Sequence, residues 1–216
     1  MSASAPPCVL VHGFADDSTT WAPLIEHLPE MPVHAWDLPG HGERTSAPAA
    51  LMSRDATVRE LHERLVALDH PVTLVGHSLG GYLALMATIM RPELVSSLAL
   101  ISSGPGFRKP EARAAWNEYM DSIAAKAAIP AAVTQLAHQP DSYVIDNVGT
   151  LRCRLVHMIG SRDHRYRAGA DHLRKVLPHS RLVEIEGAGH HPQRTHPAAV
   201  AAEIRQLREE AGIRAG

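Results

Sequence analysis

A serine, an aspartate and a histidine each follow a strand-like run of this 216-residue sequence. They are Ser78, Asp163 and His190. A serine hydroxyl becomes an effective nucleophile when a histidine takes its proton, and the histidine needs a carboxylate to orient it. Because functional groups of an open parallel sheet gather outside the carboxyl ends of its strands, we expect these three side chains to lie together. The chemistry that the set predicts is attack of the serine on a carbonyl carbon.

Ser78 stands at the centre of a G-H-S-L-G motif, between the strand-like run 72–75 and a helical run. This strand–turn–helix context is that of a nucleophile elbow, in which a sharp turn holds the serine in a strained backbone conformation. Gly76 and Gly80 fit because neighbouring backbone leaves no room for larger side chains. His77, inside the motif, is assigned a supporting role. The alternative is a glycine-rich turn that contains a serine by chance.

Two backbone N–H groups are predicted to bind the oxyanion that forms on attack. Leu79 follows the nucleophile at the start of a helix, and Phe14 lies in the loop after the first strand. Gly13 allows that loop to turn, and His12 is interpreted as a structural partner of the loop rather than as a base. For Asp163 the alternative role is to cap a turn or a helix, and for His190 it is a place on the surface.

The apolar periodicity predicts strands that alternate with helices. This pattern implies right-handed crossovers, and therefore an α/β fold with an open parallel sheet and helices on both of its faces. The whole chain, 1–216, is predicted to be one domain. The expected strands are 8–11, 33–36, 72–75, 98–101, 154–159 and 181–185, and the expected helices outside the insertion are 21–28, 57–68, 82–90, 171–177 and 197–210.

The alternation stops at about 104–150, where no strand-like run occurs. This segment is interpreted as a short helical lid over the carboxyl edge of the sheet; the alternative is a pair of ordinary crossover helices. Trp116, Tyr119 and Met120 would line an acyl pocket from this lid, or would pack the lid onto the body.

Several arginines surround the candidate acid Asp163. Arg162 and Arg165 would contact an anionic group of the substrate, or would lie in a solvated loop. No metal site is expected, because the neighbouring histidines His190, His191 and His196 have no ordered carboxylate or cysteine partner.

The chain resembles the α/β-hydrolase-fold serine hydrolases of the small, short-lidded kind over residues 8 to about 205. The chain order serine, aspartate, histidine is the order of that fold. The resemblance implies esterases, thioesterases, lactonases, acyltransferases, carbon–carbon bond hydrolases or cofactor-free haloperoxidases; dehalogenases of the family use aspartate in place of Ser78. The matching motifs are H-G-F at 12–14, D-L-P-G-H-G at 37–42, G-H-S-L-G-G at 76–81, G-S-R-D at 160–163 and G-A-G-H at 187–190.

One feature of the family pattern is missing. The family usually begins with an antiparallel hairpin, whereas only seven residues precede the first strand of this chain. We therefore expect six strands, all parallel, with the second strand at one edge and the others following in the order first, third, fourth, fifth, sixth. Cys8 and Cys153 would then lie three strand spacings, about 14 Å, apart, too far for a disulfide.

Charge and composition limit the kinds of molecule that the chain is expected to bind and the compartment that it is expected to occupy. A net charge of −2 gives no electrostatic reason to bind nucleic acid. The sequence has no apolar run long enough to span a membrane and no recognisable signal peptide, and two cysteines suit a reducing compartment. We therefore expect a cytoplasmic protein with a small-molecule acyl substrate and no cofactor.

The predicted function is hydrolysis of an ester or thioester of a small to medium acyl substrate through an acyl-serine intermediate. The alternatives on the same three residues are a carbon–carbon bond hydrolase or lyase acting on a carboxylated metabolite, a lactonase and an acyltransferase. A further alternative, of another class, is a binding protein that keeps the fold without catalysis.

Overall fold

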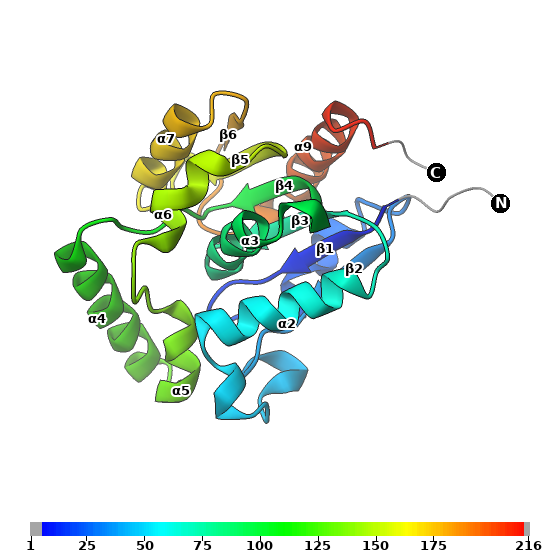
Figure 1. The fold of residues 1–216 in the computed structure, drawn as a ribbon. Helices are drawn as coiled ribbons and strands as arrows, with labels where there is room; N and C mark the ends of the chain where they lie inside the picture. The colour runs from blue at the N-terminus through cyan, green and yellow to red at the C-terminus, as the bar shows by residue number, and fades with distance from the viewer. Residues whose placement is uncertain (1–5, 214–216) are drawn as a thin grey trace.

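The computed structural model describes residues 6–213 and contains one sheet of six parallel strands (Figure 1). The strand order is β2-β1-β3-β4-β5-β6, which confirms the order expected from the sequence. Every adjacent pair runs parallel, so all six carboxyl ends point to the same edge. The strands are β1 (Cys8–Val11), β2 (Val33–Trp36), β3 (Val72–His77), β4 (Val95–Ile101), β5 (Arg154–Gly160) and β6 (Arg181–Ile185).

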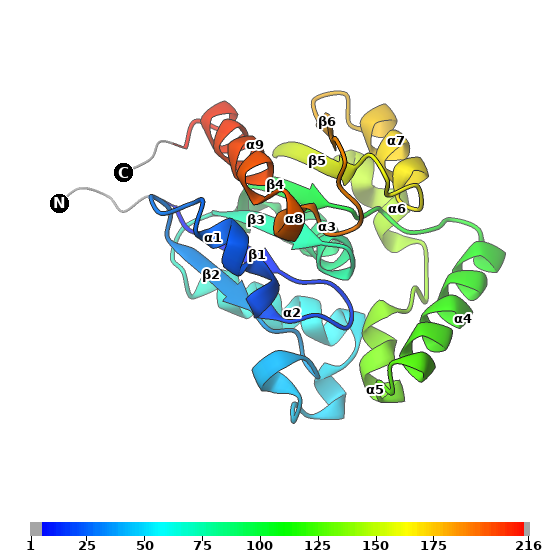
Figure 2. The ribbon, with the colours of Figure 1, turned by 180° about the vertical axis from the view of Figure 1, so that it is seen from behind.

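Helices cover both faces of the sheet (Figures 1 and 2). None of the helices within residues 6–213 has the length and apolarity that crossing a membrane requires. The α-helices are α1 (Ala22–Ile25), α2 (Arg54–Val66), α3 (Leu79–Met90), α4 (Pro110–Lys126), α5 (Ala131–Thr134), α6 (Tyr143–Asn147), α7 (Arg167–Val176), α8 (Pro192–Thr195) and α9 (Pro197–Glu210).

The strands are apolar because both of their faces are buried. In β1, Val9 and Val11 belong to the core under α2 and α3, whereas Cys8 and Leu10 belong to the core under α1 and α9. This alternation follows from the two-residue period of a strand. It also explains why the strands appear in the sequence as continuous apolar runs.

Several helix boundaries differ from the predicted ones. The helix expected over 21–28 is the shorter α1, Ala22–Ile25, and the helix expected over 82–90 begins at Leu79. The helix expected over 57–68 begins three residues earlier, at Arg54, because the Ser53 hydroxyl accepts a hydrogen bond from the Ala56 N–H at 3.3 Å and caps the helix. The helix expected over 171–177 begins at Arg167. The first turns, R-D-A-T in α2 and R-A-G-A in α7, contain no large apolar residue, so apolar spacing does not reveal either start.

The segment between β4 and β5 is helical, with α4, α5 and α6 in succession (Figure 1). A buried arginine ties it to the body of the domain. Arg54 is 5% exposed, and its guanidinium donates to both carboxylate oxygens of Asp141 at 2.7 and 2.8 Å. This bidentate pair links α2 to the loop before α6.

Both cysteines are free, as the sheet order implies. Cys8 lies on β1, and Cys153 directly precedes β5, with β3 and β4 between them. Burial raises the pKa of the Cys8 thiol to about 12 and that of Cys153 to about 11, so neither is an activated thiolate.

The buried histidine of β5 makes the stability of the fold sensitive to acid. His157 is 2% exposed, and burial lowers its pKa from the ordinary 6.5 to about 4. Below pH 6.5 the unfolded chain therefore takes up this proton before the folded chain does, and the stability present above pH 6.5 is lost as the pH falls towards 4. The free energy of unfolding of the wild type should therefore be lower at pH 4.5 than at pH 7, and His157→Gln should reduce this difference by roughly 2–3 kcal/mol, measured by urea unfolding.

His34→Gln, at an exposed position on β2, is the control and should leave the difference in unfolding free energy unchanged. Equal pH dependence in both variants would contradict the prediction.

Candidate active site

Ser78 occupies a strained turn between β3 and α3. Its φ is 51° and its ψ is −115°, in a region that few residues other than glycine adopt. The turn is closed so tightly that a Cβ on Gly80 would lie 2.1 Å from the Val11 carbonyl oxygen, and one on Gly76 would lie 2.5 Å from the Gly80 carbonyl oxygen. Only glycine fits at these two positions, and the serine is held at the carboxyl edge of the sheet.

Asp163 and His190 form a direct pair at the same edge. Asp163 follows β5, His190 follows β6, and the His190 Nδ1–H donates to Asp163 Oδ2 at 2.8 Å. Asp163 is 7% exposed. Burial opposes its ionisation, but the hydrogen bond and charge of His190 hold the pKa of the carboxyl below its usual range. The carboxylate is therefore ionised at neutral pH and fixes the imidazole with its Nε2 free to accept a proton.

The Ser78 hydroxyl contacts a residue that the sequence analysis did not single out. Ser78 Oγ lies 3.3 Å from the hydroxyl of Tyr166, and the Tyr166 ring stacks on the His190 ring with centroids 4.9 Å apart and planes 19° apart. Among the residues that the structure describes, no hydrogen bond joins Ser78 Oγ to His190.

His77 braces the loop that carries His190. The ring is 1% exposed, and its Nε2–H donates to the His190 carbonyl oxygen at 2.8 Å. Burial and the neighbouring histidines His190 and His191 lower its pKa well below the ordinary value, so it stays neutral. His77 also lies with Asp16 and His191 in a group of donor atoms of the kind that binds metal ions.

The loop after β1 is held by a buried histidine. His12 Nδ1–H donates to the Gly13 carbonyl oxygen at 2.7 Å, and His12 Nε2 accepts from the Leu38 N–H at 2.9 Å. Burial lowers the pKa of His12, which agrees with a neutral ring in this role. Both hydrogen bonds are to backbone, so His12 supports the loop. The loop places Phe14 beside the cavity that Leu79 also lines.

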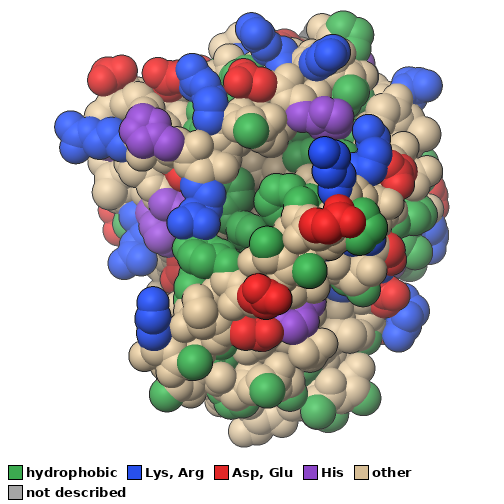
Figure 3. Space-filling view, turned by 90° about the vertical axis from the view of Figure 1, so that its left-hand side faces the viewer, with side chains coloured by type: hydrophobic (Ala, Val, Ile, Leu, Met, Phe, Trp, Pro, Cys, Tyr) green, Lys and Arg blue, Asp and Glu red, His purple; other side chains and the backbone are tan. Residues whose placement is uncertain are grey.

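Ser78, Asp163, Tyr166 and His190 border one cavity of about 670 Å³. Figure 3 shows a hollow lined by hydrophobic side chains, with basic side chains and histidines near its rim. Trp116, Tyr119 and Met120 of α4 lie on its wall, together with Phe107. Trp116 also donates from its indole N–H to the Ala137 carbonyl oxygen at 2.9 Å. The α4 side chains therefore both line the cavity and pack within the helical segment.

The arginines near Asp163 differ in their position relative to the cavity. Arg165 lines the cavity, with its guanidinium carbon 4.2 Å from the centroid of the Tyr119 ring. Arg162 is exposed and does not line the cavity, and Arg167 pairs with Glu184 at the surface. Of the two candidate substrate-contacting arginines, Arg165 is therefore the one that a bound molecule would meet.

Known proteins resemble this chain in sequence. The sequence profile of the alpha/beta hydrolase family matches residues 8–203. Lipase LipV of Mycobacterium tuberculosis is 42% identical over 100 residues, which are 45% of this chain and 38% of that protein. The 2-succinyl-6-hydroxy-2,4-cyclohexadiene-1-carboxylate synthase of Enterobacter sp. is 29% identical, over 94% of this chain and 91% of that protein.

The fold is also shared with solved structures. A thermophilic esterase from Thermogutta terrifontis superposes with a TM-score of 0.81 and 24% identity, over 97% of this chain and 91% of that one. The chain spans only 31% of the length of the mycobacterial proteins that lead the sequence matches, and that match covers 48% of this chain.

Proposed function

Because this chain belongs to the alpha/beta hydrolase family, we propose that it is a serine hydrolase that cleaves an ester or thioester of a small to medium acyl substrate. The observation that carries the proposal is the Asp163–His190 hydrogen bond of 2.8 Å beside a serine in a strained elbow, with all three residues on one apolar-walled cavity. Hydrolysis of p-nitrophenyl acetate and butyrate by the purified chain is the first test. The proposal requires turnover that depends on Ser78.

The reaction has two steps. Ser78 Oγ attacks the substrate carbonyl carbon while His190 Nε2 takes the hydroxyl proton, and the tetrahedral oxyanion accepts hydrogen bonds from the Phe14 and Leu79 N–H groups. The imidazolium returns the proton to the departing alcohol or thiol, which leaves an acyl-serine. Water, activated by His190, then releases the acid and the free enzyme. Asp163 stays ionised throughout and stabilises the imidazolium.

Tyr166 is expected to orient the nucleophile. Burial raises the pKa of its hydroxyl, which stays protonated and can donate to Ser78 Oγ; the serine proton is then free to point at His190. Tyr166→Phe keeps the ring stacked on His190 but removes this hydrogen bond, which is worth about 0.5–1.5 kcal/mol. We expect kcat/KM for p-nitrophenyl butyrate to fall about two- to tenfold. Tyr166→Leu, which also removes the ring, should lower it further. A Phe variant as fast as wild type would contradict this role.

A second candidate function is a lyase or carbon–carbon bond hydrolase acting on a carboxylated metabolite. Two observations favour it: Arg165 lies on the cavity wall, and the relative from Enterobacter that matches along most of the chain is by name a carboxylate synthase. In that case a carboxylate of the substrate would pair with the Arg165 guanidinium.

Arg165→Gln tests the carboxylate site on which the second candidate depends. If the cavity binds a carboxylate, p-nitrophenyl succinate should be a better substrate than p-nitrophenyl butyrate, and Arg165→Gln should lower kcat/KM for the succinate ester about 10- to 100-fold, the value of a charged hydrogen bond. The butyrate ester should change little. Arg162→Gln, which removes an exposed charge outside the lining of the cavity, is the matched control. Equal effects of Arg165→Gln on the two esters would exclude the carboxylate site.

A further inference from the structure

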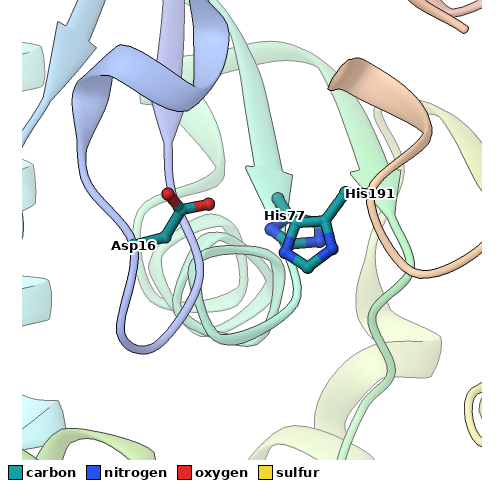
Figure 4. Close-up of side chains that lie close together, drawn as sticks. All are labelled: Asp16, His77 and His191. Carbon is teal, nitrogen blue, oxygen red and sulfur yellow. The ribbon is translucent and has the colours of Figure 1, made fainter. Parts of the chain in front are cut away.

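A second group of reactive side chains lies behind the nucleophile. Asp16, His77 and His191 come from three different places in the chain: the loop after β1, the end of β3 and the start of α8. One potential ligand atom of each lies within 4.8 Å of those of the other two. Figure 4 shows the Asp16 carboxylate directed towards the neighbouring rings of His77 and His191. The mechanism proposed above uses none of these three side chains as an acid, a base or a nucleophile.

The hydrogen bond of His77 fixes which of its nitrogens is free. A carbonyl oxygen can only accept, so His77 Nε2, 2.8 Å from the His190 carbonyl oxygen, carries the proton. Nδ1 of this neutral ring therefore holds a lone pair. That atom is buried and has no hydrogen-bond partner within residues 6–213. Metal-binding histidines commonly have this arrangement, in which one nitrogen donates to a backbone carbonyl and the other faces the ion.

The Asp16 carboxylate adds a second unsatisfied acceptor. Its Oδ1 accepts from the Asp17 N–H at 3.0 Å, whereas Oδ2 is buried and has no partner in the described part of the chain. Two residues of this close group, His77 and Asp16, thus each have a buried electron-pair donor without a hydrogen-bond partner in the described part of the chain, His77 Nδ1 and Asp16 Oδ2. An arrangement of this kind is unfavourable unless an electropositive group satisfies both atoms.

We propose that Asp16, His77 and His191 bind a divalent transition-metal ion of the Zn²⁺ class. Two imidazole nitrogens and one carboxylate oxygen form a ligand set that such ions use, with a fourth position left for water. Bonds of about 2.0–2.2 Å place tetrahedral ligands roughly 3.4 Å apart, so the three atoms need to close by at most about 1.4 Å from the 4.8 Å limit. Asp16 and His191 are only partly buried, which leaves their side chains room to adjust.

The bound ion would join the three segments on which the active site depends. Asp16 is two residues from Phe14, His77 precedes Ser78, and His191 follows His190. A ligand that binds only the folded chain stabilises it by mass action. The ion should therefore raise the unfolding temperature, independently of whether the chain hydrolyses esters.

The test is a titration of the metal-free full-length chain with Zn²⁺ in competition with a chromogenic chelator. We expect wild type to bind one equivalent, and Asp16→Ala and His191→Ala each to weaken binding at least about tenfold. His34→Ala, which removes an exposed histidine on β2, should bind as wild type does. Zn²⁺ should raise the unfolding temperature of wild type and His34→Ala, but not that of the two site variants.

X-ray absorption at the zinc edge measures the ligand types and the metal–ligand distances independently. Two imidazole nitrogens and a carboxylate oxygen at about 2.0–2.2 Å would support the site. Equal Zn²⁺ affinity in wild type and His191→Ala, an ion on other histidines only, or a water molecule alone between the three side chains in the presence of Zn²⁺ would overturn it. His191→Ala removes a partly exposed side chain, so the comparison holds even if Asp16→Ala folds poorly.

Discussion

Replacement of Ser78 by alanine should lower kcat for p-nitrophenyl butyrate hydrolysis by about 10⁶-fold, to the level that cavity binding and the oxyanion donors alone can support. The reason is that Ser78 Oγ is the atom that forms the covalent bond, and no second nucleophile is proposed for the first step. The change removes one oxygen from a half-buried side chain and should leave the fold intact.

The histidine gives the control for this prediction. His190→Ala removes the base, so it should lower kcat about as much as Ser78→Ala does. The double variant should be hardly slower than either single variant, because the effects of substituting residues that act as a unit are not additive. Steady-state rates of the three variants, with folding checked by circular dichroism, make the comparison. Losses that multiply in the double variant would mean that Ser78 and His190 act in separate steps.

Asp163→Asn is expected to lower kcat about 10⁴-fold. Asp163 Oδ2 accepts the proton of His190 Nδ1, which leaves Nε2 free to receive the serine proton. An asparagine can instead donate its amide N–H to Nδ1 and so hold the imidazole in the wrong tautomer. The expected loss is therefore catalytic, with KM little changed.

Asp171→Asn is the matched control, since it neutralises an exposed aspartate on α7 a few residues further along the chain. Its rate should equal that of wild type. The assignment of Asp163 as the acid would be wrong if Asp163→Asn kept a tenth or more of the wild-type rate.

The architecture could be predicted from the sequence because buried parallel strands have a strong sequence pattern. Cys8–Val11 is apolar throughout and Val72–His77 is mostly apolar, and every residue of both strands is buried because helices cover both faces of the sheet. The order of the strands followed from the resemblance to the family and from the handedness of the crossovers. Helix starts were harder to predict, because the first turns of α2 and α7 contain no large apolar residue.

The site was predictable only where local sequence determines geometry. The strained turn around Ser78 follows from Gly76 and Gly80, which leave space for the backbone. Tyr166 could not be found this way: it is a loop tyrosine three residues after Asp163, and its contact with Ser78 depends on how two distant loops approach each other. The same holds for Arg162 and Arg165, of which only Arg165 lines the cavity.

The proposed metal site lay outside sequence reasoning for a similar reason. From the sequence we expected no metal site, because His190, His191 and His196 had no ordered carboxylate or cysteine partner. Asp16 and His191 are 175 residues apart in the sequence, and folding brings both of them to His77. No spacing motif encodes that approach. Contacts between loops at the carboxyl edge of the sheet are therefore the part of this molecule that only a three-dimensional structure supplies.

The most direct test of the central claim is covalent labelling of the purified chain with a fluorophosphonate, followed by peptide mass spectrometry. Such a probe phosphonylates a serine only where a base and an oxyanion site activate it. We predict one label per chain, on Ser78, lost in Ser78→Ala and strongly reduced in His190→Ala. An unlabelled Ser78 in a folded chain that still binds small molecules in the cavity would contradict the account and would favour a binding protein with this fold.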